Sequence, residues 1–305
     1  MTETPESRAG VTDVDLSGTT ALVTGSTSGI GREAALSLGR LGADVLVHGR
    51  DETAGNEVVD ELVDAGSDAR FVEADFASIE DVNALAETVR TETSELDVLL
   101  NNAGGLFRTG RLTDAGVEYT FHVNHLAPYL LTTNLLGHLA PDARVVTTAS
   151  EAHRGAQPNW DAVTSVDDYS TFGAYSRSKL ANIQFSIELA HRLDAADDEI
   201  TSNALHPGAI PGSGFARFLP GPIPRAMQLL DGLPFVTSVD DGAAALVNLA
   251  ASDRLEGVSG RYFDQQQIRT PSSAALDPDS QHDLWTRSAE FLDIDVPLSE
   301  ASTQG

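Results

Sequence analysis

The pair Tyr175 and Lys179 has the residue types and the spacing for proton-transfer chemistry. Side chains four residues apart share one face of a helix, so the phenol and the ammonium would be neighbours. A free tyrosine titrates at about 10, and a nearby positive charge lowers that pKa by stabilising the phenolate. Such a phenol can give a proton to a forming alkoxide or take one from an alcohol. The pair therefore predicts acid–base catalysis with Tyr175 as the proton carrier.

Lys179 is also the only lysine in the chain, because the other 18 of the 19 basic residues are arginine. A tyrosine and a lysine at this spacing occur together by chance in many proteins. An ordinary surface pair would not explain why the single lysine stands here. We therefore expect Lys179 to be functional.

A glycine-rich segment, residues 24–31, follows the first apolar run and opens a helical pattern. Glycines let a backbone turn sharply and approach a pyrophosphate, and the helix N-terminus then offers N–H groups and a positive dipole end. The alternative is a glycine turn without a ligand. The position between a strand and a helix favours a dinucleotide site, formed by Gly25, Ser26, Thr27, Ser28, Gly29, Ile30 and Gly31.

The end of the second strand bears on the choice of cofactor. An acid at the strand tip would bind a ribose 2′-hydroxyl and favour NAD. Here the tip is Gly49, followed by Arg50, whose guanidinium can pair with a 2′-phosphate and favours NADP(H). The alternatives left open are Asp51 as the tip acid, with NAD as cofactor, and Arg32 as a second phosphate ligand or a solvated helix residue.

These residues need a scaffold, and the hydrophobic pattern supplies one. Short apolar runs alternate with amphipathic stretches, which indicates a parallel sheet with helices on both faces. We expect a single-domain α/β fold, doubly wound and of the Rossmann type. The predicted strands are 20–24, 44–48, 69–74, 96–101, 144–149, 200–205 and 260–263, and the predicted helices are 31–41, 51–65, 79–91, 117–139, 173–193 and 240–251.

With these motifs in this order, the chain resembles the short-chain dehydrogenase/reductase family from about Gly18 to about Leu292. The family's first loop has the form Thr-Gly-x-x-x-Gly-Ile-Gly, as in residues 24–31. The resemblance implies an oxidoreductase that moves a hydride between a nicotinamide and an alcohol or ketone carbon. In such an enzyme Tyr175 is the general acid or base, and Lys179 also reaches the nicotinamide ribose.

The resemblance assigns roles to further residues. Ser150 would hydrogen-bond the substrate oxygen, and Asn124 would kink the long helix and hold a water of a proton relay. Thr147 and Thr148 are alternatives to Ser150, and a satisfied core amide is the alternative for Asn124. The cofactor contacts implied are Asp75 and Phe76 at the adenine, Asn102, Ala103 and Gly104 at the adenine ribose, and Pro207 and Gly208 at the nicotinamide.

Three points within these assignments stay open. Asp75 could instead cap a helix. His153 could touch substrate or be structural. Ser213 could take the place of the threonine that many members carry after the Pro-Gly pair. The spacing of His122, His125 and His153 does not suggest a metal site, so we expect none.

Several stretches are similar to the retinol-dehydrogenase-like branch in particular: 124–126, 150–153, 178–182 and 259–263. This likeness implies a lipophilic alcohol or ketone as substrate. The competing hypothesis is a protein that binds NADP(H) and senses it without chemistry. Such proteins usually lose the tyrosine or the lysine, and this chain has both.

Composition sets outer limits on the function. The net charge of −27 disfavours nucleic acid and anionic membranes as partners, and zero cysteines exclude disulfides and thiolate metal sites. The acids are dispersed along the chain, as in proteins from salt-accumulating halophiles, so we expect a protein adapted to high salt; the alternative is an ordinary acidic protein. No apolar run could span a membrane and no signal peptide is evident, so we expect a soluble cytoplasmic protein.

The remaining expectations concern organisation. Residues 1–16 are expected to be disordered, 17–295 to form the catalytic domain, and 296–305 to be a tail. A proline-rich apolar excursion at about 209–236 is expected to contact substrate. The helix after Tyr175 carries two apolar rows, only one of which can face the sheet. We therefore expect the other row to pair with a second copy, in a homodimer or homotetramer.

Overall fold

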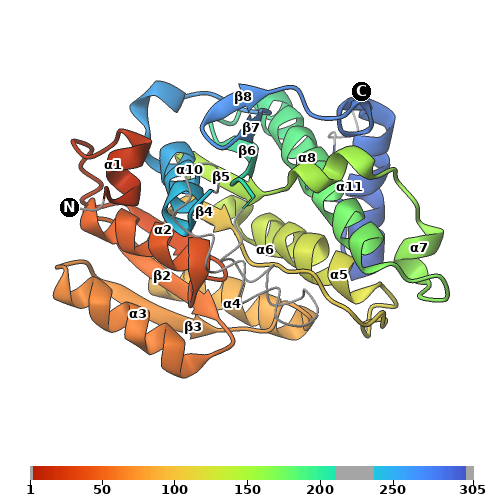
Figure 1. The fold of residues 1–305 in the computed structure, drawn as a ribbon, viewed down its shortest axis with the longest axis horizontal. Helices are drawn as coiled ribbons and strands as arrows, with labels where there is room; N and C mark the ends of the chain where they lie inside the picture. Colours follow the sequence, from red (N-terminus) through yellow and green to blue (C-terminus); the bar gives the residue numbers. More distant parts are fainter. Residues whose placement is uncertain (1–2, 210–236, 300–305) are drawn as a thin grey trace, which may run out of the picture.

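The computed structural model describes residues 3–209 and 237–299. Within these ranges, eight strands form one sheet in the order β3-β2-β1-β4-β5-β6-β7-β8 (Figure 1). Strands β1 to β7 pair in parallel, and β8 pairs antiparallel with β7. The strands are β1 (Thr20–Val23), β2 (Asp44–Gly49), β3 (Ala69–Glu73), β4 (Leu96–Asn101), β5 (Leu139–Thr148), β6 (Thr201–His206), β7 (Tyr262–Asp264) and β8 (Gln267–Arg269).

Helices cover both faces of this sheet, so the predicted doubly wound α/β fold is confirmed. Helices α2, α3 and α10 lie on one face, and α4, α6 and α8 lie on the other. The order of strands reverses between β1 and β4, and ligands bind at this point in such sheets. The helices are α1 (Pro5–Ala9), α2 (Gly29–Arg40), α3 (Glu52–Asp64), α4 (Ile79–Glu92), α5 (Tyr119–Phe121), α6 (Ala127–Leu135), α7 (Asp161–Thr164), α8 (Thr171–Ala195), α10 (Val239–Ala251) and α11 (Pro278–Leu292).

Most boundaries of the predicted elements are within a few residues of the observed ones. Strand β5 begins at Leu139, well before the predicted Arg144, because Leu139 pairs with Leu96 and an irregularity in β4 follows. Strand β8 was not predicted. Its three residues are all exposed, so no apolar pattern marks it.

The N-terminal segment is not disordered where the structure describes it, so that expectation is wrong. Helix α1 packs on α10 and α2, and three apolar side chains of this segment are buried. Arg40 donates two hydrogen bonds to the carboxylate of Glu6, at 2.8 and 2.9 Å. The sequence did not predict helix α1, because the segment is short and its few apolar residues show no helical periodicity. The buried residues are Ala9, Val11 and Leu16.

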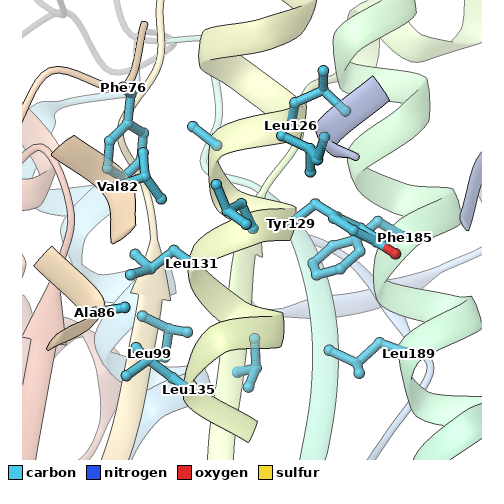
Figure 2. Packing of buried hydrophobic residues seen from close by; sticks show 14 of the residues in the cluster. Phe76, Val82, Ala86, Leu99, Leu126, Tyr129, Leu131, Leu135, Phe185 and Leu189 are labelled. Atoms are coloured by element: carbon cyan, nitrogen blue, oxygen red, sulfur yellow. The ribbon is translucent and has the colours of Figure 1, made fainter. Parts of the chain in front are cut away.

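The C-terminal helix α11 covers the face of α8 that was expected to pair with another copy. Leu180, Ile183 and Ile187 form one buried row of α8. The second row also lies inside the core beside α6 (Figure 2). The ring of Phe185 in this row stacks on Trp285 of α11. The second row consists of Ala181, Phe185 and Leu189. Because this chain covers both rows itself, the reason for expecting a homo-oligomer through α8 no longer holds.

Candidate active site

The glycine-rich loop lies between β1 and α2, at the carboxyl edge of the sheet. Gly25 and Gly29 have φ of 66° and 60°, which glycine adopts without the penalty of a Cβ. The side chain of Ser28, the N-cap of α2, makes no capping hydrogen bond to the helix. A Cβ at Gly29 would meet no atom within 4 Å. An uncapped helix N-terminus beside open space suits a phosphate group.

The loop is held in place by the segment after β4. The side-chain amide of Asn102 donates to the carbonyl of Thr24 at 2.9 Å, and the N–H of Ala103 donates to its hydroxyl at 3.0 Å. A Cβ on Gly25 would lie 2.8 Å from the Cα of Ala103, so only glycine allows this approach. Asn102 and Ala103 thus hold the start of the glycine loop through hydrogen bonds to Thr24. Gly104, the next residue, faces the catalytic candidates.

Arg50 lies just beyond the end of β2, as predicted, and its guanidinium is well exposed. Its Nη1 is 3.6 Å from a carboxylate oxygen of Asp75, at the end of the neighbouring strand. Asp51 instead caps α3, where its carboxylate accepts from the N–H of Ala54 at 3.1 Å. Asp51 is therefore less suited to bind a ribose 2′-hydroxyl as the acid at the strand tip.

Arg32 is already paired, because its guanidinium donates to Glu33 at 2.6 Å and to Glu61 at 2.5 Å. These two bonds match the interpretation of Arg32 as a helix-surface residue. A bound phosphate would have to compete with both carboxylates for it. Arg50 is the better placed of the two arginines.

Asp75 does not cap a helix, since Ser78 is the N-cap of α4. Its carboxylate accepts from the N–H of Ala77 at 3.0 Å and faces Arg50. Phe76 has only 3% of its surface exposed, and its ring lies in the core beside Val82 (Figure 2). Because the ring is buried, only the backbone of Phe76 could make the expected contact with adenine.

Tyr175 and Ser150 lie together, although 25 residues separate them in sequence. Ser150 follows β5 and begins a short 3₁₀ helix, η3 (Glu151–Gly155), where its hydroxyl accepts from the N–H of Ala152 at 3.3 Å. The side chains of Ser150 and Tyr175 are hydrogen-bonded. Tyr175 is on the first part of α8 and is partly exposed. Thr147 is buried within the strand, consistent with core packing.

Lys179 is also on α8, one turn beyond Tyr175, and its side chain is buried. Its Nζ donates to the carbonyl of Thr148 at 2.8 Å and lies 5.7 Å from the centre of the tyrosine ring. An ammonium has three protons, so two remain for other acceptors. A Cβ on Gly104 would be 3.8 Å from Nζ, which places the ammonium beside the segment after β4.

The electrostatics of this pair differ from the expectation. Burial raises the pKa of Tyr175, and the hydrogen bond with Ser150 only partly offsets the rise. Burial also lowers the pKa of Lys179, to about 8. The expected lowering of the tyrosine pKa by Lys179 is therefore not observed. The reason is desolvation, which disfavours both charged forms.

Asn124 interrupts the regular helix as expected. It lies in a π-helical segment, η1 (His122–Leu126), between α5 and α6. Its side chain accepts from the N–H of Gly105 at 2.8 Å and donates to the carbonyl of Gly105 and the hydroxyl of Ser178, both at 2.9 Å. The amide is thus satisfied and locks the helix against the segment after β4 and against α8.

His153 has a structural place beneath Ser150. Its Nδ1 donates to the carbonyl of Ser150 at 2.7 Å, and its Nε2 accepts from the N–H of Ser272 at 3.1 Å. The second bond fixes the tautomer, because an acceptor nitrogen carries no proton. The ring is fully buried and packs edge-on against Tyr262, at 5.1 Å between centroids. His153 therefore connects Ser150 to the loop that follows β8 and contains Ser272.

The remaining candidates lie at the end of β6. Pro207 and Gly208 follow this strand, and a Cβ on Gly208 would collide with the side chain of Thr237, at 2.4 Å. Thr237 and Gly208 thus lie against each other. Ser213 and nearly all of the 209–236 excursion lie outside the described residues. In the part of the chain that the structure describes, no helix is long and apolar enough to cross a membrane.

The doubly wound sheet thus carries a helix N-terminus without a side-chain cap, a hydrogen-bonded Ser-Tyr pair and a buried lysine. Residues 19–218 match the family described as short chain dehydrogenase. The chain therefore belongs to the short-chain dehydrogenase family of oxidoreductases.

Known proteins of similar sequence and structure support this assignment. Retinol dehydrogenase 14 of Mus musculus is 37% identical over 292 residues, covering 91% of this chain and 86% of that protein. Polyprenol dehydrogenase of Mus musculus is 37% identical over 276 residues, covering 88% and 82%. The structure of landomycin C-6 ketoreductase LanV with bound NADP and rabelomycin has a TM-score of 0.65 and 26% identity, covering 87% and 99%.

Proposed function

We propose that this protein is an NADP(H)-dependent oxidoreductase that transfers a hydride between the nicotinamide and a lipophilic alcohol or ketone carbon. The observation that carries the proposal is the arrangement of Ser150, Tyr175 and Lys179 beside the glycine loop. The four catalytic residues proposed are Asn124, Ser150, Tyr175 and Lys179.

The cofactor would lie along the carboxyl edge of the sheet, where the residues present suit a dinucleotide. Open space at Gly29 and the uncapped N-terminus of α2 fit its phosphates. A bound nicotinamide would give or accept the hydride. The proposed contacts are residues 25–31, Arg50, Asp75, Phe76 through its backbone, Asn102, Ala103, Gly104, Tyr175, Lys179, Pro207 and Gly208.

Tyr175 would move the proton that accompanies the hydride. Burial raises the pKa of the Tyr175 phenol. In its protonated form the phenol can donate its proton to a carbonyl oxygen. Ser150, bonded to Tyr175, would hold the same oxygen by a second hydrogen bond. In the oxidative direction the phenolate form of the same side chain would take the proton from the alcohol.

Three lines of support favour NADP(H) and a lipophilic substrate. Arg50 offers an exposed guanidinium where an acid would favour NAD. LanV, which is similar in structure, was solved with NADP bound. The names of the similar curated proteins, retinol dehydrogenase and polyprenol dehydrogenase, point to long apolar alcohols.

The cofactor proposal predicts a specific response at Arg50. Arg50→Ala should lower kcat/KM for NADPH by about 30-fold, because a charge-assisted pair is worth about 2 kcal/mol. The value for NADH should change much less, since NADH has no 2′-phosphate. Steady-state kinetics with both cofactors measure this. Arg70→Ala, which removes an exposed arginine near the amino end of the adjacent strand β3, is the matched control. A wild-type preference for NADH would contradict the proposal.

A further inference from the structure

We infer that His48 is a positioning residue for the dinucleotide: its neutral imidazole joins the glycine loop to the strand ends that carry Arg50 and Asp75. The inference rests on the proposed function and adds a residue that is almost completely buried. The inference is argued from hydrogen bonds that join three segments distant in sequence: the glycine loop, the end of β2 and the end of β3.

The imidazole of His48 bonds to one segment through each ring nitrogen. Nδ1 lies 3.2 Å from the N–H of Gly25 and accepts from it. Nε2 lies 3.2 Å from the carbonyl of Ala74 and donates to it. The first bond needs a lone pair and the second needs a proton, so only one neutral tautomer satisfies both.

The surroundings of the ring keep it in that state. His48 is 3% exposed, and its ring stacks on Phe76 with 4.6 Å between centroids and 27° between planes. Burial lowers its pKa to about 4, so the ring is neutral at physiological pH. A protonated ring would turn the Gly25 bond into a contact between two N–H groups.

The backbone of His48 adds two bonds to the same loop. Its carbonyl accepts from the N–H of Ser26 at 2.9 Å, and its N–H donates to the hydroxyl of Ser26 at 3.0 Å. These bonds are available to any residue at this position. The bond from Nδ1 to Gly25 depends on the side chain, and it orients the first peptide of the loop.

The three joined segments are those that would bind separate parts of one ligand. The glycine loop would hold the pyrophosphate. Arg50 is two residues beyond His48, and Asp75 follows Ala74 directly. A shift of the loop relative to these residues would misplace the phosphates relative to the 2′-phosphate and the adenine. The imidazole therefore sets the distance between the glycine loop and the strand ends that carry Arg50 and Asp75.

The test compares two variants that each keep one of the two bonds. In His48→Asn, the side-chain carbonyl can take the place of Nδ1 and accept from Gly25. In His48→Gln, the longer amide can reach Ala74 but offers no acceptor to Gly25. Binding of NADPH is measured by its fluorescence at molar KCl, and kcat is measured at saturating NADPH. His138→Asn is the control, because His138 contacts Thr93 at 2.8 Å, away from the loop.

We expect His48→Gln to raise the Kd for NADPH about tenfold, the size of one lost hydrogen bond, with kcat at saturation unchanged. His48→Asn should stay within about threefold of wild type, even if its melting temperature falls. Equal binding by His48→Gln and wild type would overturn the inference, as would equal weakening by both variants. A wild-type protein that binds neither NADPH nor NADH would overturn the proposed function itself.

If His48→Gln does not fold, hydrogen exchange on the wild-type protein gives the answer. The amide proton of Gly25 should exchange slowly without any cofactor, because Nδ1 already accepts it. Rapid exchange of that amide in an otherwise protected strand–loop junction would overturn the inference.

Discussion

At the scale of single residues, two of the four proposed catalytic groups, Asn124 and Lys179, are buried, and Ser150 and Tyr175 are partly exposed. Lys179 is 4% exposed and already donates to the carbonyl of Thr148. The same burial that lowers its pKa to about 8 leaves it mostly charged at neutral pH. Burial raises the pKa of Tyr175.

Removal of the His153 side chain is predicted to lower turnover without changing cofactor binding. His153→Ala removes the donor to the carbonyl of Ser150, so the serine should lose its fixed position beside Tyr175. We expect kcat to fall about tenfold while the Kd for NADPH stays unchanged.

The conservative variant His153→Asn is the control for that prediction. Its amide can still donate to the carbonyl of Ser150, so it should recover most of the lost kcat. Steady-state kinetics on one converted ketone, with NADPH titrations beside them, give both quantities. An alanine variant with wild-type kcat would contradict the role of His153 in placing Ser150.

Spacing alone could predict the pair Tyr175 and Lys179, whereas Ser150 and Asn124 were predicted only through the family resemblance. The bonds of His48 and His153 could not be predicted, since Gly25, Ala74 and Ser272 are distant from them in sequence. A histidine within an apolar strand, such as His48, was the only available signal. The pKa of Tyr175 was predicted in the wrong direction because its burial depends on tertiary packing.

At the scale of elements, α11 completes the core that α6 and α8 begin. Trp285 of α11 is 1% exposed, and its ring lies parallel to that of Phe185, with 5.9 Å between centroids. Tyr129 of α6 donates from its hydroxyl to the carbonyl of Trp285 at 3.1 Å. The aromatic rings from three helices thus form one packed cluster.

This packing predicts that Trp285→Ala lowers the free energy of unfolding by about 3–5 kcal/mol, because a large cavity would remain in the core. Urea denaturation at constant high salt measures the loss. Trp160→Ala is the comparison, since Trp160 is only partly buried and should cost less. A loss at position 285 no larger than at position 160 would show that α11 is only loosely attached.

The elements that escaped prediction share one physical cause. Helix α1 and strand β8 are short, and their residues are stabilised by contacts with α10 and β7 rather than by a pattern of their own. The short apolar runs of β1, β2 and β4 could be located from the alternation of apolar runs with amphipathic stretches. Helix α11 appeared in the sequence only as part of the family resemblance.

At the scale of the whole molecule, the charge of −27 is the dominant feature. Forty-six acidic side chains repel one another at low salt, and added salt screens that repulsion. We therefore predict that the melting temperature rises steeply from low to molar KCl. Calorimetry at constant pH across that range is the measurement. A melting temperature that stays flat would reject the proposed adaptation to high salt.

The central claim is that Tyr175 carries the proton in a dinucleotide-dependent hydride transfer. The most direct measurement follows NADPH oxidation at molar KCl with a panel of lipophilic ketones, for wild type and Tyr175→Phe. We predict turnover by wild type and a loss of at least about 100-fold in kcat for the variant, with the Kd for NADPH unchanged. Wild type that binds NADPH but oxidises it with no substrate would favour a cofactor sensor. Turnover by Tyr175→Phe at the wild-type rate would contradict the account outright.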